Sequence, residues 1–208
     1  MLDRLGHLPG TDLDFPAYSA DFDREYAALT GVIWKLERHQ TFREPGDPSW
    51  EAFMAGDWPR ALELNDAERP DVEAQVAAER ARGVETRRVR VVEHPPGPYV
   101  QWEMQYLRLL AEAGDRPRVL DAADVRDWEA RHGDLPEVLV LAGRLAYLLR
   151  YDGGGTPAGC RRIDDPAAVR GTAAEIADLY ERAEPLLDYF AREIAPLPPP
   201  APRDTPLD

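Results

Sequence analysis

The chain has only one cysteine and one lysine among its 208 residues. Because the lone cysteine, Cys160, cannot form an intramolecular disulfide, the composition favours a reducing compartment. Lys35 is the only lysine, so no second lysine is available for Schiff-base or phosphate-loop chemistry. No apolar run approaches the roughly 18 residues of a membrane span, and residues 1–10 lack the apolar core of a secretory signal. We therefore expect a cytoplasmic protein without a membrane segment.

Signatures of the common metal, nucleotide and covalent-nucleophile enzymes are also missing. The four histidines are widely separated, and none lies near a second histidine at helical spacing or near a Cys-x-x-Cys pair, so no zinc site is predicted. The glycine run at residues 153–155 lacks the patterns of phosphate-binding loops, and no G-x-S-x-G nucleophile elbow is present. We predict no cofactor and no metal, and these absences favour a non-catalytic protein.

Positive charge is scarce, because 25 basic residues face 39 acidic ones and the formal net charge is −14. Nucleic-acid affinity comes mainly from lysine and arginine side chains that neutralise phosphates. We therefore expect no direct binding to DNA or RNA, and the same charge opposes binding to anionic membranes. Solubility is the simplest explanation of the acidic surface.

What is present is an alternation of helical and strand patterns that predicts an α/β fold. We expect a mixed sheet of five to seven strands with packed helices. Residues 84–120 read as strand, helix and strand, which predicts a parallel β-α-β unit from Val84 to Leu120. The expected organisation is a flexible N-terminal arm at residues 1–16, a single α/β domain at 17–195 and a disordered proline-rich tail at 196–208.

One acidic residue interrupts the apolar stripe of the clearest helix, which we place at residues 99–113. Tyr99, Trp102 and Tyr106 follow helical spacing, and Glu103 lies within the same stripe. A buried carboxylate must be paired, be protonated or reach the edge of the core. On the preceding strand, Arg88 and Arg90 share one face and can supply the partner.

Glu37, on the strand at residues 32–37, is a further candidate for the same polar cluster. Three interpretations of the cluster remain open. It is an ion pair that fixes the helix on the sheet, or a small polar pocket edged by the aromatic rings that binds a ligand or partner side chain, or a site where Glu103 acts as general acid or base.

A family resemblance is carried by residues 34–37 (WKLE), 50–56 (WEAFMAG), 88–92 (RVRVV) with Pro95, Tyr99 and Glu103, and 151–152 (YD). These segments resemble a domain family of unknown function in actinomycetes, with the pattern RLE…F-x-x-F-x-x-G…RVRVV-x-x-P-x-x-x-Y-x-x-x-E…YD-x-x-G. Lys35 stands where that pattern has arginine. Such proteins are often encoded beside helix-turn-helix regulators. The resemblance therefore implies a regulatory or interaction role, and it implies a helix-turn-helix regulator as the partner.

A more distant likeness is to one half of the phospholipase D-like fold. Enzymes of that class carry an H-x-K pair on the strand before the turn, but residues 134–137 here read DLPE. The likeness therefore implies a related fold without the phosphodiester chemistry.

The leading hypothesis is a non-catalytic regulatory or interaction module that binds a partner protein or a small-molecule ligand. The first alternative is an enzyme, or an accessory protein, of actinomycete specialised metabolism that uses the Glu and Arg pocket. The second alternative is a component of a toxin-antitoxin pair.

Overall fold

A computed structural model describes residues 1–201. Within them lie the helices η1 (Leu2–His7), α1 (Phe15–Ala27), α2 (Pro48–Met54), α3 (Trp58–Ala67), α4 (Arg69–Ala81), α5 (Pro98–Ala113), η2 (Ala122–Asp124), α6 (Arg126–His132), α7 (Pro166–Arg182), α8 (Leu186–Tyr189) and η3 (Phe190–Ile194). The strands are β1 (Thr11–Leu13), β2 (Gly31–Glu37), β3 (Val84–Val92), β4 (Arg118–Asp121), β5 (Val138–Leu141), β6 (Leu145–Tyr151), β7 (Pro157–Ile163) and β8 (Glu184–Pro185).

The strands form one mixed sheet in the order β1-β7-β6-β5-β2-β3-β4-β8. The α/β class and the mixed sheet agree with the sequence, but the described residues contain eight strands, so the predicted number of five to seven was wrong. The two strands that were missed are the edge strands β1 and β8, of three and two residues. Segments this short have no measurable period-2 pattern, and their pairing with β7 and β4 defines them.

The predicted β-α-β unit is present as β3, α5 and β4, and β3 pairs with β4 in parallel. Parallel pairing also joins β2 to β3, with Lys35 opposite Arg88 and Glu37 opposite Arg90. Helix α5 ends at Gly114, whose positive φ of 107° suits a left-handed C-terminal cap. The centre of the sheet therefore places Lys35 and Glu37 of β2 beside Arg88 and Arg90 of β3.

Residues 1–16, which the sequence predicts to be a flexible arm, contain η1 and β1. Leu2 and Leu5 of η1 are buried in the core beside α7, and β1 extends the sheet edge by pairing with β7. Sequence periodicity could not reveal these two elements. Residues 1–16 add only two buried leucines and three strand residues to a core and a sheet that the rest of the chain forms. Of the proline-rich tail predicted at 196–208, residues 202–208 lie outside the described part of the chain.

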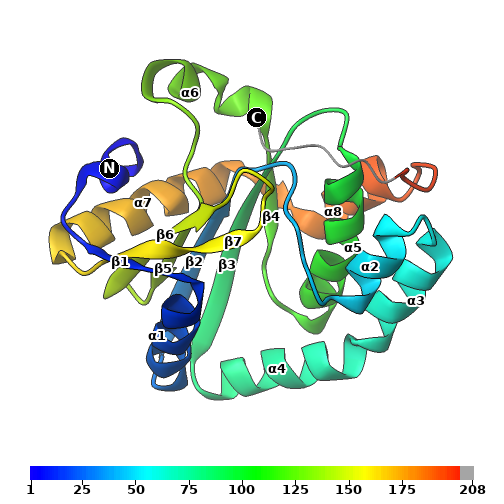
Figure 1. Ribbon diagram of the computed structural model, residues 1–208, viewed down its shortest axis with the longest axis horizontal. Coiled ribbons are helices and arrows are strands. Elements are labelled where there is room, and N and C mark those ends of the chain that lie inside the picture. Colours follow the sequence, from blue (N-terminus) through cyan, green and yellow to red (C-terminus); the bar gives the residue numbers. More distant parts are fainter. Residues whose placement is uncertain (202–208) are drawn as a thin grey trace.

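The two faces of the sheet are covered differently (Figure 1). Helix α7 lies along one face and packs on Leu36, Val89 and Val140. On the other face, α1 packs on the β5-β6-β7 side of the sheet, and α5 with α2–α4 covers the β3 side. Ile33, Lys35 and Glu37 of β2 face this second side. No helix in residues 1–201 is long and apolar enough to cross a membrane.

Candidate functional site

A cavity of about 410 Å³ opens on the second face of the sheet, between α1 and the α2–α5 group. It begins at the carboxyl end of β2, the end of a parallel strand where α/β proteins commonly bind ligands. Six of the seven residues proposed from the sequence line it: Glu37, Arg88, Tyr99, Trp102, Glu103 and Tyr106. The seventh, Arg90, is fully buried beneath it.

The floor of the cavity is a three-residue ion cluster centred on Glu37. Lys35 Nζ lies 2.6 Å from Glu37 Oε1, and Arg88 Nη1 donates to Glu37 Oε2 at 2.6 Å. Burial alone raises the pKa of Glu37, but the charges of Arg88, Lys35 and Arg90 outweigh it and lower the pKa to about 2. Two cations therefore share one ionised carboxylate and keep a net positive charge at the floor.

Of the two arginines that the sequence offers as partners of Glu103, Arg90 is the one bonded to it, since Arg90 Nε donates to Glu103 Oε2 at 2.7 Å. Arg90 Nη1 also donates to the carbonyl of Val91 at 3.1 Å, while Nη2 is buried and has no partner within the described part of the chain. Burial, together with the negative charge of Glu37, raises the pKa of Glu103, and the charge of Arg90 opposes this rise. Glu103 is thus paired with a buried arginine and also lines the cavity.

Aromatic rings form the walls. The Tyr99 hydroxyl donates to Glu44 Oε1 at 2.9 Å, and Trp102 Nε1 donates to Ser49 Oγ at 2.9 Å, so both rings are fixed in position. Phe42 packs against Tyr99 and Tyr151, with ring centroids 5.4 Å and 4.7 Å apart. These contacts join the loop after β2 to the start of α5 and to the end of β6.

A second cavity of about 510 Å³ adjoins the first and continues along the same face of the sheet. The two cavities share Tyr18, Lys35, Arg88, Tyr106 and Leu149 as lining residues. Lys35 and Arg88 therefore lie where the two spaces meet, and a ligand in either one is within reach of a positive charge.

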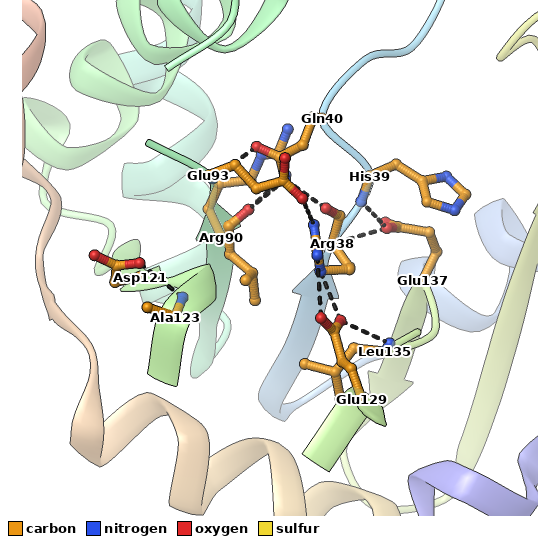
Figure 2. A network of polar contacts seen from close by, with 11 residues as sticks. Arg38, His39, Gln40, Arg90, Glu93, Asp121, Ala123, Glu129, Leu135 and Glu137 are labelled. Atoms are coloured by element: carbon orange, nitrogen blue, oxygen red, sulfur yellow. Dashed lines mark hydrogen bonds and ion pairs between the residues drawn. The ribbon is translucent and has the colours of Figure 1, made fainter. Parts of the chain in front are cut away.

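A polar network beyond the end of β2 holds the loop that carries Phe42 (Figure 2). Arg38 makes a bidentate pair with Glu129, at 2.6 Å and 3.1 Å, and lies 3.0 Å from Glu93. Glu137 Oε1 accepts from the backbone N–H groups of Arg38 and His39, at 2.6 Å and 2.7 Å. Because the loop is bonded to elements on both sides, the cavity wall that it forms is preorganised.

Several lining residues were not proposed from the sequence. Lys35 is on the same face of β2 as Glu37, so alternation within the strand was the signal that could have found it. Glu44, Asn65 and Tyr151 had no such signal, because they come from a loop, a helix and a distant strand that meet only in the folded chain.

Comparison with known proteins places the chain in one family. The family model of DUF6879, a domain of unknown function, matches residues 20–191. This is most of the chain, so the chain belongs to the DUF6879 family. No curated protein matches it.

Proposed function

We propose that the chain is a ligand-binding module whose cavity recognises a small molecule and whose role is regulatory. The observation that supports this best is the ion cluster of Lys35, Glu37 and Arg88 at the floor of a 410 Å³ cavity. That volume is within the range of small-molecule sites, and such sites combine apolar walls with a few fixed polar groups. Charged groups that are already paired and positioned cost little entropy when a ligand binds.

The regulatory part of the proposal rests on the resemblance seen in the sequence. A helix-turn-helix protein is the partner that this resemblance implies, and a cytoplasmic location is compatible with one buried cysteine. In this proposal, ligand occupancy changes how strongly the module binds its partner. The actinomycete origin and the phospholipase D-like likeness stay predictions.

The proposal is tested by a thermal-shift screen of a metabolite library against a cavity-blocked variant. Leu149 lines both cavities without taking part in the ion cluster, so Leu149→Trp fills the space and leaves the charges intact. Leu187→Trp is the matched control, because Leu187 is 42% exposed on α8. We expect compounds that stabilise the wild type and Leu187→Trp to lose their effect on Leu149→Trp.

Equal stabilisation of both variants by every compound that binds would contradict a ligand site in the cavity. Circular dichroism of Leu149→Trp is the control for folding.

An enzymatic role is the second candidate, favoured by one observation. Glu103 has a raised pKa and lines the cavity, which is the environment of a general acid. Glu103→Gln keeps the size of the side chain and removes the titratable proton. Turnover of a bound compound that is lost in Glu103→Gln, with binding retained, favours the enzyme over the binding module.

A further inference from the structure

The charges that line the first cavity are unequal. Acidic lining residues outnumber basic ones by five to three. Glu37 and Glu103 are bonded to basic partners. The other three acids, Glu44, Asp47 and Glu68, come from the segment that leads into α2 and from the turn after α3. This side of the cavity therefore carries a net negative charge.

The acidic side is under electrostatic repulsion. Burial raises the pKa of Glu68, and the charges of Asp47 and Asp71 raise it further. Burial also raises the pKa of Glu44, with Glu103 and Asp47 adding to the rise and Tyr99 and Lys35 opposing it. A positive charge placed among these carboxylates would relieve the repulsion.

Asn65 gives a second and independent indication of a ligand. It is only 2% exposed, it lines the same cavity, and its Nδ2 is buried with no hydrogen-bond partner among residues 1–201. Buried amide groups in folded proteins are almost always bonded, since an unmet donor costs stability. An unbonded amide donor on a residue that lines the cavity is suited to a ligand oxygen.

Aromatic rings complete the acidic side. Tyr99, Trp102 and Tyr106 of α5 line the cavity together with Glu44 and Glu68. Ring faces attract organic cations, and this attraction grows when water is excluded. In residues 1–201 no three His, Cys, Asp or Glu side chains converge in the manner of metal ligands. The acids do not converge on one point, an arrangement that suits an organic cation better than a metal ion.

We propose that the ligand is a small organic cation, a protonated amine or quaternary ammonium that also carries a hydroxyl or carbonyl oxygen. Its nitrogen lies against the rings of α5 near Glu44 and Glu68, and its oxygen accepts from Asn65 Nδ2. This inference rests on the proposed function, because it assigns a chemical class to the ligand of the same cavity.

The test uses choline and its uncharged carbon isostere, 3,3-dimethylbutan-1-ol, as probes in a ¹H–¹⁵N titration that follows the Trp102 indole. We expect choline to shift this signal and the alcohol to bind at least about tenfold more weakly, because the two differ only in charge. Glu68→Gln should weaken choline roughly three- to tenfold. Glu63→Gln removes the same charge from the exposed surface of α3, where Glu63 is 68% exposed, and should leave the affinity within about twofold.

A third probe isolates the oxygen contact. Tetramethylammonium keeps the charge of choline and lacks the hydroxyl. Asn65→Leu should therefore weaken choline and leave tetramethylammonium unchanged, with the thermal midpoint of the variant serving as the folding control.

Three results overturn the inference. The first is binding of the alcohol as tight as that of choline. The second is equal weakening of choline binding by Glu68→Gln and Glu63→Gln. The third is the absence of any shift at Trp102 with all three probes. If the library screen still yields neutral or anionic compounds that Leu149→Trp excludes, the cavity remains a ligand site and only the cationic class is lost. If no compound depends on Leu149, the proposed function fails as well.

Discussion

The ion pair between Arg90 and Glu103 allows a prediction about which partner is the more costly to remove. Arg90 is completely buried and Glu103 is 7% exposed. Glu103→Leu leaves a completely buried guanidinium that cannot lose its proton and has lost its bonded carboxylate. Breaking a buried pair in this way costs about 3–5 kcal/mol. Because Glu37 and Glu137 also attract Arg90, we expect a value near the lower end, about 3 kcal/mol.

Arg90→Met should cost less, since the Glu103 carboxyl can take up a proton. The carbonyl of Val91 keeps a donor in this variant, because Gln40 Nε2 also donates to it at 2.9 Å. The double variant Arg90→Met/Glu103→Leu should be within about 1 kcal/mol of the wild type, as replaced buried pairs often are. Urea denaturation at pH 5 and pH 7 measures all four free energies of unfolding. A cost below about 1 kcal/mol for Glu103→Leu would refute this reasoning. So would a cost for Arg90→Met that exceeds the cost of Glu103→Leu.

Three further outcomes are expected. Burial raises the pKa of Glu137 to about 7, so the folded chain binds the Glu137 proton more tightly than the unfolded chain does. The stability that this proton contributes is fully present below about pH 4.5 and is lost as the pH rises through 7. Unfolding free energies across that window should therefore fall by roughly 3 kcal/mol more in the wild type than in Glu137→Gln, and parallel curves would contradict this. Leu5→Ala should cost about 2–5 kcal/mol in urea denaturation because Leu5 is 1% exposed, whereas a change below 0.5 kcal/mol would mark the arm as loosely held. Asn65→Leu should raise the stability of the unliganded chain by about 1 kcal/mol, because an unbonded buried amide is removed; lower stability would show that the amide has a structural partner.

The part of the site that local patterns determine was predictable. Helical spacing placed Tyr99, Trp102, Glu103 and Tyr106 together, and strand alternation placed Arg88 and Arg90 on one face. The choice between the two arginines was not predictable from one sequence. It depends on the register of β2 against β3 and on the height of α5 above the sheet, which side chains from the whole domain determine.

The same limit applies to the fold. The β-α-β unit was predictable because β3, α5 and β4 are long, periodic and consecutive in the chain. The edge strand β1 was not predictable, because Thr11–Leu13 is a strand only through its pairing with β7, about 150 residues further along the chain. Asn65 was missed for a related reason, since its lack of a partner is a property of the packed cavity.

The most direct test of a ligand site at the Lys35 cluster uses the fact that the chain has one lysine. Lys35 lines both cavities, and its side chain is 26% exposed. The rate of its acetylation is measured by mass spectrometry with and without a compound from the library screen. The amine of Met1, which lies at a different cavity beside α7, provides the reference rate in the same molecules.

At a ligand concentration ten times Kd, we expect acetylation of Lys35 to slow about tenfold while that of Met1 is unchanged. An unchanged Lys35 rate, with a compound that still stabilises the protein, would place the ligand elsewhere and contradict the proposed site.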